Sequence, residues 1–258
     1  MGQIEPTQPA EELTVLIPVW NERECIADVL RAFEDAPGLQ QVRVLLVDDG
    51  STDGTGPLLD GYSRTHPRVE TLHMSHGGKD RALWAGFPVV RTGWTGMMDG
   101  DGQYAPNDFP KLLAFARQVR ADAVWGIRVH RQDHALRFLS SWIGRTTKRL
   151  ALGGQVVQDT GCGIWIACSR YLQSIPGVCP DPAGQVHCHI PELVATQGGR
   201  VAELEITHRL RTAGRAKFGA LNRIVPGLIS LCQAARCRRR LMKLPSAGKQ
   251  QAAGFSQK

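Results

Sequence analysis

The chain has 258 residues, 42% hydrophobic and 21% charged, which is the composition of an ordinary globular protein with enough residues to bury a sizeable core. Its seven cysteines contain no C-x-x-C pair, which argues against a zinc site or a disulfide framework and favours a reducing compartment. The N-terminus has no apolar core segment, so we expect no secretory signal.

The formal net charge of +7 is unevenly distributed. From residue 200 onward the chain has many arginines and lysines, but its only acids are Glu203 and Glu205. A basic C-terminal third favours an anionic partner, such as nucleic acid, anionic lipid or a phosphorylated substrate. No aromatic residues alternate with these cations as they do on surfaces that stack bases, so we expect no nucleic-acid partner.

Strand-like and helix-like segments alternate along the first half of the chain. We expect strands at 13–19, 42–50, 71–75, 95–99 and 122–128, and helices at 21–35, from about 51–55 onward, at 79–91 and at about 107–120. This βαβα order predicts an α/β domain with a mostly parallel sheet flanked by helices on both faces.

Beyond residue 128 the pattern is less regular. We expect a helix at about 134–152, a strand at 161–168, a short helix near 187–197, a strand at 200–206 and a last helix from beyond Gly219 to about Arg240, bent or restarted by Pro226. The predicted organisation is a flexible tail at 1–12, one domain at 13–220, a C-terminal helix at 221–243 and a disordered tail at 244–258.

Charged side chains follow three of the predicted strands. They are Asp48, Asp49, Asp99, Asp101 and Arg128. Parallel sheets bind ligands at the carboxyl ends of their strands, where the chain turns into loops. We therefore expect these side chains to converge on one edge of the sheet.

The D-G-D-G-Q segment at 99–103 is a candidate metal site. In an extended segment residues i and i+2 point the same way, so Asp99 and Asp101 can face one ion, and Gly100 leaves room beside them. Gln103 offers a further oxygen. Such hard oxygen ligands suit Mg²⁺ or Mn²⁺, which often bridge to phosphates. Taken alone, the segment is more typical of a plain turn.

Three other segments each have a structural and a functional interpretation. VDDGSTDGT (47–55) is a turn with a helix cap, or a carboxylate that accepts hydrogen bonds from a nucleotide base or ribose. HGGKDRALWAGF (76–87) is a surface turn or a phosphate cradle, without the spacing of a P-loop. HRLRTAGRAKFG (208–219) is a solvated basic loop or a lid over a phosphorylated ligand.

Four motifs in order along the chain resemble those of family 2 glycosyltransferases of the GT-A fold. They are I-P-V-x-N-E-R at 17–23, V-D-D-G-S-T-D-G-T at 47–55, D-G-D-G-Q at 99–103 and R-x-x-G-R-A-K-F-G at 211–219. The last is the more specific pointer, to the dolichyl-phosphate mannosyltransferase-like group that uses polyprenyl-phosphate acceptors. The resemblance covers roughly residues 13–225 and implies a single catalytic domain.

The resemblance implies a donor site. Its expected nucleotide-binding residues are Pro18, Asn21, Glu22, Asp49 (hydrogen-bonded to the base) and Asp99. Two further residues are expected here from the local sequence: Lys79 of the possible phosphate cradle, and Gly100, which leaves room for the diphosphate. Asp99, Asp101 and Gln103 are expected to hold the Mg²⁺ or Mn²⁺ that bridges the donor's diphosphate.

The resemblance also implies a set of acceptor and catalytic residues. Arg128 and, as a weaker match, Arg145 are expected to meet phosphate, and Arg211 and Lys217 match cations of the acceptor loop. Ala216 stands where many members of the group have serine. Asp159, in QDTGC, matches an element near the sugar, and with Asp101, Arg128, Arg211 and Lys217 it completes the expected catalytic set.

The resulting hypothesis is a metal-dependent inverting glycosyltransferase that moves a sugar from a UDP- or GDP-sugar to polyprenyl phosphate. A phosphate acceptor is already ionised, so it needs cations rather than a general base. Two alternatives stay open: the same fold acting on a sugar or lipid hydroxyl with Asp159 as the base, and a catalytically silent protein that binds nucleotide-sugar or docks on a membrane.

The C-terminal helix bears on the expected location. Many relatives carry transmembrane helices after the catalytic domain, but the apolar stretch within 221–243 is too short to span a bilayer and ends in an arginine cluster. It is either an interfacial helix on anionic lipid or a packed helix with a solvated basic end. The interfacial interpretation gives a cytoplasmic protein held peripherally on the inner face of the membrane.

Overall fold

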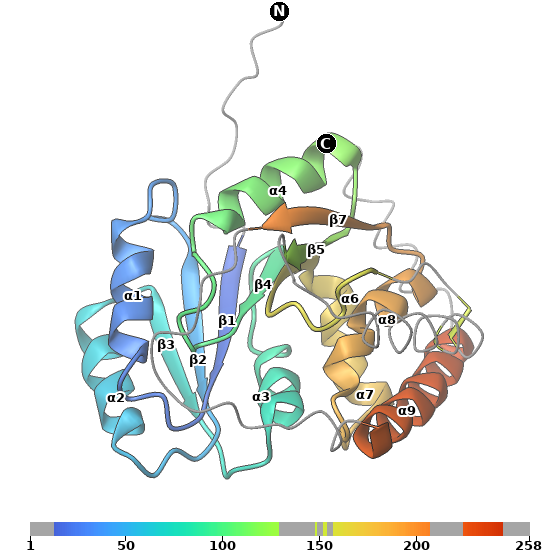
Figure 1. Ribbon diagram of the computed structural model, residues 1–258, viewed down its shortest axis with the longest axis horizontal. Helices are drawn as coiled ribbons and strands as arrows, with labels where there is room; N and C mark the ends of the chain where they lie inside the picture. The colour runs from blue at the N-terminus through green and yellow to red at the C-terminus, as the bar shows by residue number, and fades with distance from the viewer. Residues whose placement is uncertain (1–12, 129–147, 149–151, 154–156, 207–223, 245–258) are drawn as a thin grey trace, which may run out of the picture.

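The computed structural model describes residues 13–128, 148, 152–153, 157–206 and 224–244 (Figure 1). A seven-stranded sheet, in the order β3-β2-β1-β4-β6-β5-β7, forms the centre of the molecule. Its strands are β1 (Leu13–Val19), β2 (Arg43–Asp48), β3 (Val69–His73), β4 (Trp94–Met98), β5 (Ala123–Arg128), β6 (Ile164–Cys168) and β7 (Val201–Ile206). All strand pairs except those of β6 are parallel, which confirms the predicted mostly parallel sheet.

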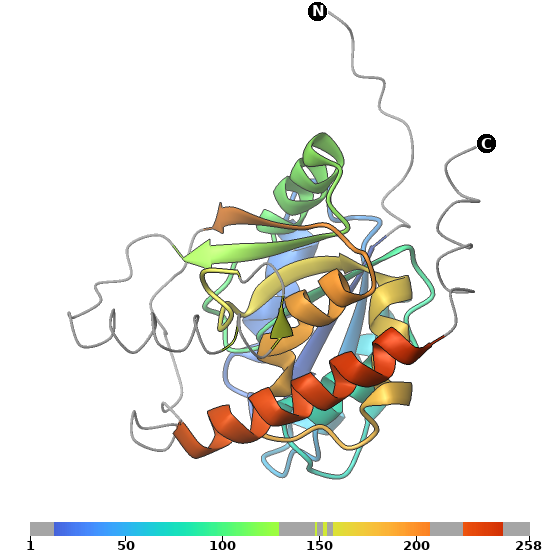
Figure 2. The same cartoon turned by 90° about the vertical axis from the view of Figure 1, so that its right-hand side faces the viewer.

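Helices cover both faces of this sheet. They are α1 (Ile26–Asp35), α2 (Thr55–Thr65), α3 (Lys79–Gly86), α4 (Asp108–Val119), α6 (Ser169–Gln173), α7 (Ile175–Val178), the 3₁₀ helix η2 (Val186–His189), α8 (Ile190–Thr196) and α9 (Ile224–Lys243). Helices α4 and α8 both contact β5 and β7, and they lie on opposite sides of these strands (Figures 1 and 2).

The central strands are continuous apolar runs in the sequence because both of their faces are buried in the core. Leu16, Ile17 and Leu46 of β1 and β2 are fully buried, as expected for parallel strands that are covered on both faces. Farther along the sheet, the rings of Trp125 and Trp165 stack across β5 and β6 with centroids 4.6 Å apart. These contacts give the strand ends a rigid base.

Two predicted helices are shorter in the structure. Helix α1 begins at Ile26 rather than at residue 21, because Asn21 has a φ of 52°, in the left-handed region, and the chain only starts to turn at Glu22. Helix α3 ends at Gly86 rather than at 91, because Pro88 has no backbone N–H to continue the helical hydrogen bonds.

Strand β6 differs most from its prediction. It is shorter than 161–168, and it runs antiparallel to both of its neighbours, β4 and β5. The apolar pattern of a buried strand carries no information about its direction. As a consequence, β4 and β5 point the same way, and β6 begins at the edge where they end. The turn at 161–163 therefore reaches the same edge as the loops after β1, β2 and β4.

Several predictions fall outside the described residues. They are the tails, most of the predicted helix at 134–152 and the basic segment at 208–219. The domain limits stay predictions, although α9 coincides with most of the expected C-terminal helix. Within the described ranges, no helix has both the length and the apolar character needed to cross a membrane.

Candidate functional site

The loops after β1 and β2 are joined into one platform. The backbone N–H of Asn21 donates to Ser51 Oγ at 3.0 Å, and Thr52 N–H donates back to Asn21 Oδ1 at 2.8 Å. Glu22 N–H donates to Thr55 Oγ1 at 3.2 Å. The predicted pocket residues Asn21 and Glu22 therefore connect the two motifs that the sequence presented as separate.

Asp49 is buried at the end of β2 and holds the glycine-rich loop. Its carboxylate oxygens accept hydrogen bonds from the N–H groups of Gly77 at 2.7 Å and Gly78 at 2.8 Å, and the ring of His76 lies 2.9 Å away. Both oxygens are thus engaged with the 76–78 loop. The predicted bond from Asp49 to a nucleotide base stays a prediction, and the structure gives this carboxylate a loop-holding role.

An aromatic pair beside Asp49 was missed by the sequence analysis. The rings of Trp20 and His76 stack with centroids 4.3 Å apart and planes 19° from parallel. Trp20 follows β1 directly, and His76 belongs to the loop held by Asp49. No spacing in the sequence connects two single aromatic residues so far apart, and only the parallel pairing of β1 with β2 and of β2 with β3 brings their loops to one edge.

Lys79, the first residue of α3, makes an ion pair with Asp99. Its Nζ lies 2.5 Å from Asp99 Oδ1. Burial by itself would lower the pKa of Lys79, but the attraction of Asp99 more than offsets it, and the net pKa is raised. Lys79 is therefore charged at neutral pH and neutralises one of the two predicted metal-binding carboxylates.

Asp99 packs against Gly163, the residue just before β6. A Cβ at Gly163 would lie 2.1 Å from Asp99 Oδ2 and 2.7 Å from Tyr104 Cε2. Asp99 N–H donates to the Gly163 carbonyl at 2.9 Å, and Gly163 N–H donates to Tyr104 Oη at 2.8 Å. The site therefore requires glycine at 163. The DGDGQ segment alone does not predict this requirement, because Gly163 lies far from it in the sequence.

The D-G-D-G-Q segment is itself a tight turn that orients Asp101. Asp101 Oδ1 accepts the N–H of Gln103 at 3.2 Å, and Gly102 has a φ of 75°. A Cβ at Gly100 would lie 3.3 Å from Ile17 Cγ2 and 3.5 Å from the carbonyl oxygen of Pro18, so Gly100 lies close against the end of β1. The turn and metal interpretations are compatible, because the turn brings both carboxylates to the edge of the sheet.

The donor set at this edge fits a divalent cation shared with a substrate. No group of three or more His, Cys, Asp or Glu side chains in the described part of the chain is arranged to hold a metal. Mg²⁺ is commonly held by one or two carboxylates together with substrate phosphates rather than by a complete protein cage. The carboxylates of Asp99 and Asp101, with the amide oxygen of Gln103, match this mode.

Arg128 and Asp159 form a two-bond ion pair. Arg128 donates from Nε and from one terminal nitrogen to the two oxygens of Asp159, each at 2.7 Å. Burial would lower the pKa of Arg128, but the bonds to Asp159 more than offset it, and the net pKa is raised. These two bonds commit the Asp159 carboxylate to an ion pair with Arg128.

Most of the predicted site residues lie along this one edge. Those within the described residues are Pro18, Asn21, Glu22, Asp49, Lys79, Asp99, Gly100, Asp101, Gln103, Arg128 and Asp159. Arg145, Arg211 and Lys217 lie outside the described residues, so their predicted roles as acceptor cations stay predictions.

A buried carboxylate that the sequence did not reveal lies directly behind Lys79. Asp80 accepts the backbone N–H groups of Gln185, Val186 and His187 at 2.9, 3.1 and 2.9 Å, and Nδ1 of the His187 ring is 2.5 Å away. Burial raises the pKa of Asp80, but these bonds outweigh it and the net pKa is lowered. Asp80 thus ties the start of α3 to η2.

His187 adds a second cation near Lys79. Burial lowers the pKa of its imidazole, but the neighbouring Cys188 and Asp80 outweigh burial and raise the pKa to about 9. Burial also raises the pKa of the Cys188 thiol, but the positive charges of His187, Lys79 and Lys148 outweigh it and lower the pKa. His187 therefore lies between two groups of charge opposite to its own, Asp80 and Cys188, on the side of the site formed by η2.

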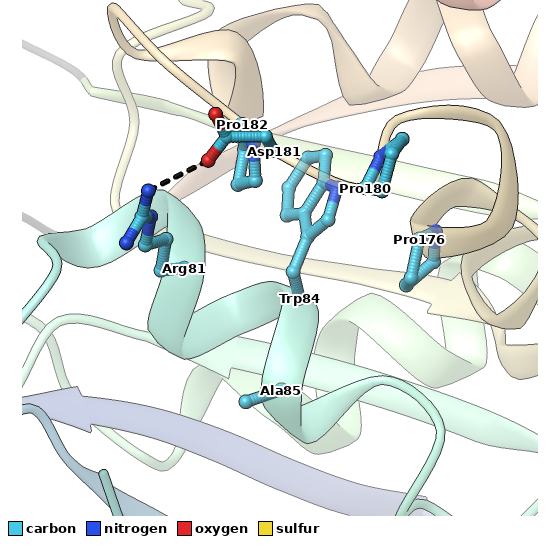
Figure 3. A pocket seen from close by; sticks show the side chains of 7 residues that line it. All are labelled: Arg81, Trp84, Ala85, Pro176, Pro180, Asp181 and Pro182. Atoms are coloured by element: carbon cyan, nitrogen blue, oxygen red, sulfur yellow. Dashed lines mark hydrogen bonds and ion pairs between the residues drawn. The ribbon is translucent and has the colours of Figure 1, made fainter. Parts of the chain in front are cut away.

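A separate hollow of about 430 Å³ lies between α3 and the loop after α7 (Figure 3). Its lining residues are Arg81, Trp84, Ala85, Pro176, Pro180, Asp181 and Pro182. Trp84 Nε1 donates to the Cys179 carbonyl at 2.7 Å, and Arg81 pairs with Asp181 at 2.6 Å. None of the predicted site residues lines this hollow, so it is distinct from the site at the strand ends.

The sheet order and the loops at its edge define the GT-A class of glycosyltransferase fold. The structure resembles that of glucosyl-3-phosphoglycerate synthase from Mycobacterium tuberculosis in complex with Mn²⁺, UDP-glucose and phosphoglyceric acid, with a TM-score of 0.62 and 20% sequence identity. The match covers 87% of this chain and 79% of that one. Residues 14–174 match Glycosyl transferase family 2, and the chain belongs to this family.

Curated relatives agree with the resemblance to the polyprenyl-phosphate group. The chain is 29% identical over 228 residues to undecaprenyl-phosphate 4-deoxy-4-formamido-L-arabinose transferase of Edwardsiella ictaluri (strain 93-146), covering 82% of this chain and 64% of that protein. It is 29% identical over 245 residues to dodecaprenyl-phosphate galacturonate synthase of Rhizobium johnstonii, covering 89% and 69%. The chain thus spans less than two thirds of the first relative's length.

Proposed function

We propose that this protein is a metal-dependent, inverting glycosyltransferase that moves a sugar from a nucleotide diphosphate sugar to a polyprenyl phosphate. The observation that carries the proposal is the cluster at the strand ends, where Asp99 lies beside the cation Lys79 and Asp101 lies in the turn that follows. The names of the two curated relatives support a polyprenyl-phosphate acceptor.

Each group at the edge has a role in this reaction. A divalent cation at Asp99, Asp101 and Gln103 would stabilise the negative charge that develops on the leaving diphosphate. Lys79 adds a fixed positive charge on the same side, and the platform of Asn21 and Glu22 gives the nucleotide a rigid wall.

The acceptor requires no general base in this mechanism. A phosphate is already ionised at neutral pH, so the protein has only to bring two anions together with cations. The two bonds from Arg128 to Asp159 support this mechanism over transfer to a hydroxyl, because they commit the candidate base to an ion pair. The same bonds hold Arg128 close to the edge, and we assign it to acceptor phosphate together with Arg145, Arg211 and Lys217.

Thermal unfolding with UDP, GDP, CDP and dTDP, each with and without Mn²⁺, tests the donor site first. A nucleotide present at about a hundred times its dissociation constant adds roughly 2.7 kcal/mol, which raises the melting temperature by several degrees. We expect one nucleotide to stabilise the protein only with Mn²⁺, and we expect Asp101→Asn to abolish that shift. Asp181→Asn, an exposed carboxylate away from the edge, is the matched control.

A radiolabelled transfer assay to undecaprenyl phosphate with the selected UDP- or GDP-sugar tests the reaction. We expect Asp101→Asn to reduce transfer by at least about a hundredfold, because it removes a ligand of the cation that stabilises the leaving group. A folded Asp101→Asn variant with full activity would overturn the metal-dependent mechanism. Asp159→Asn then separates the acceptor classes: phosphate transfer should survive in part, whereas transfer to a hydroxyl should be lost.

Helix α9 supports a peripheral position on an anionic membrane surface. The exposed large apolar side chains of the described residues all belong to α9 or the residue after it: Leu228, Ile229, Met242 and Leu244. Exposed cations on the same helix are Arg236, Arg239, Arg240 and Lys243. Its buried stripe is Ser230, Ala234, Cys237 and Leu241. One face therefore packs on the domain, and the outward surface combines apolar and basic side chains, as in helices that lie on anionic lipid.

Vesicle sedimentation tests this assignment. We expect the protein to bind vesicles of phosphatidylglycerol and not of phosphatidylcholine alone, and we expect the pair Arg236→Glu and Arg239→Glu to weaken binding at least tenfold. Arg31→Glu with Arg64→Glu makes the same charge change on exposed positions of α1 and α2 and should have little effect. Equal loss in both double variants would reject α9 as the docking surface.

A further inference from the structure

Both oxygens of the Asp99 carboxylate have a close neighbour in the structure. Oδ2 lies against the backbone of Gly163, where even a Cβ would come within 2.1 Å. Oδ1 is the other oxygen, and Lys79 Nζ lies 2.5 Å from it. Lys79 therefore holds the position from which a metal ion would approach Asp99.

A lysine ammonium and a divalent cation repel each other when both contact this oxygen. With Mg²⁺–oxygen distances of about 2.1 Å, an ion on Oδ1 would lie at most about 4.6 Å from the Lys79 ammonium. At that separation a double and a single positive charge repel each other strongly in a partly buried site. One of them has to move when the other binds.

The backbone around Lys79 is fixed on both sides. Before it, Gly77 and Gly78 donate to Asp49. After it, Asp80 accepts three backbone N–H groups from η2 and contacts the His187 ring. What can move is therefore the side chain of Lys79, whose four-carbon stem is flexible.

The displaced ammonium needs a new anionic partner. Asp99 is the carboxylate with which Lys79 pairs in the described part of the chain, and the neighbouring carboxylate of Asp80 is already occupied by η2. Under the proposed function, the donor's diphosphate arrives at the same edge together with the metal. It supplies two phosphate groups within reach of a lysine at the start of α3.

We infer that Lys79 competes with the divalent cation for Asp99. When metal and donor are both bound, the Lys79 ammonium moves from Asp99 and pairs with the donor's diphosphate. This inference rests on the proposed function and adds a coupling to it. The metal alone has to displace Lys79 without compensation, whereas the metal together with a nucleotide diphosphate gives Lys79 a new partner. Lys79 thereby makes the binding of metal and nucleotide mutually dependent.

Titration of Mn²⁺, with the free ion followed by electron paramagnetic resonance, tests the competition without measuring activity. In the absence of nucleotide, we expect Lys79→Met to bind Mn²⁺ at least about fivefold more tightly than the wild type. Lys79→Arg keeps a cation and should behave like the wild type. Arg81→Met is the matched control, because Arg81 lies on the same helix and pairs with the exposed Asp181. An unchanged or weaker Mn²⁺ affinity in folded Lys79→Met would overturn the inference.

Repeating the titration with saturating UDP and then GDP tests the coupling. We expect one nucleotide to tighten Mn²⁺ binding at least tenfold in the wild type and by a clearly smaller factor in Lys79→Met. An equal factor in both proteins would show that Lys79 does not couple the ligands. Wild-type protein that binds no Mn²⁺ with either nucleotide would instead reject the proposed donor site itself, so the two failures are distinguishable.

Discussion

Two buried aspartates hold distant loops in this molecule, and they do so over very different lengths of chain. Asp49 accepts two backbone N–H groups that lie 28 and 29 residues ahead of it in the sequence. Asp80 accepts three that lie 105 to 107 residues ahead. The first connects neighbouring loops of the sheet, and the second connects α3 to the C-terminal part of the domain.

The difference shows how the C-terminal part is joined to the donor side. Helix α9 packs on η2, and its Ser230 Oγ lies 3.1 Å from Nε2 of His189. On the N-terminal side of η2, Gln233 of α9 accepts the N–H of Ala183 at 2.7 Å. Because Asp80 holds η2 and also follows Lys79, one carboxylate positions both the proposed membrane-facing helix and the cation of the donor site.

The largest expected effect is that of Asp80→Ala. The substitution leaves three N–H groups without their acceptor, and each buried unsatisfied donor costs about 1–3 kcal/mol, so we expect the free energy of unfolding to fall by at least about 3 kcal/mol. Urea unfolding measures this loss, and hydrogen exchange should show faster opening at 185–187 and in α9. A loss below about 1 kcal/mol would mean that η2 is held by its other contacts.

Asp49→Ala should have a smaller and more local effect. Two N–H groups lose their acceptor, but Gly77 is exposed and its N–H can bond water, so we expect a loss of about 1–2 kcal/mol in the same urea experiment. Faster hydrogen exchange should be confined to 76–78, with α9 as protected as in the wild type. Asp49→Asn retains one acceptor oxygen and should recover part of the loss. If Asp49→Ala opened α9 as well, the two connections would not be independent.

His189 in the C-terminal region should make the free energy of unfolding depend on pH, and we expect this effect to be of intermediate size. Burial and the nearby Lys148 lower the pKa of His189 to about 3. Below a pH of about 6.5, His189 becomes protonated in the unfolded chain but stays neutral in the folded protein. The free energy of unfolding therefore falls as the pH drops. We expect this residue to account for about 2 kcal/mol of lost stability between pH 7.5 and pH 5.

Urea unfolding at several pH values measures that contribution as the difference between wild type and His189→Gln. The other groups that titrate in this range are common to both proteins, so the variant should show a flatter decline in stability below pH 6.5. Parallel curves would mean that His189 is protonated in the folded state. The pH dependence would then have to come from groups elsewhere in the protein.

The smallest effect is expected at Gly61, which lies in α2 away from both aspartates. A Cβ there meets no atom within 4 Å, and the residue is exposed within a helix. Gly61→Ala should therefore raise the free energy of unfolding by about 0.5–1 kcal/mol, since alanine has the higher helix propensity. Thermal unfolding measures the gain, and a destabilised variant would show that α2 is strained where the structure shows open space.

Much of the donor edge could be predicted because its residues are local to the strand ends. Asp49, Asp99 and Arg128 each follow an apolar run directly, so the strand pattern that locates the sheet also locates them. Their partners could not be predicted in the same way. Asp99 with Lys79, and Arg128 with Asp159, pair across 20 and 31 residues, and neither pair has a fixed spacing that a motif could reveal.

The sequence by itself determined the α/β class, the order of most strands and helices, and the edge at which the charged residues gather. Those features follow from hydrophobic periodicity and from turn residues, which act over a few positions. Only the tertiary structure decided the direction of β6, the need for glycine at 163 and the connection from Asp80 to η2. These depend on which distant segments pack together, because one buried carboxylate or one missing Cβ has meaning only through the atoms that surround it.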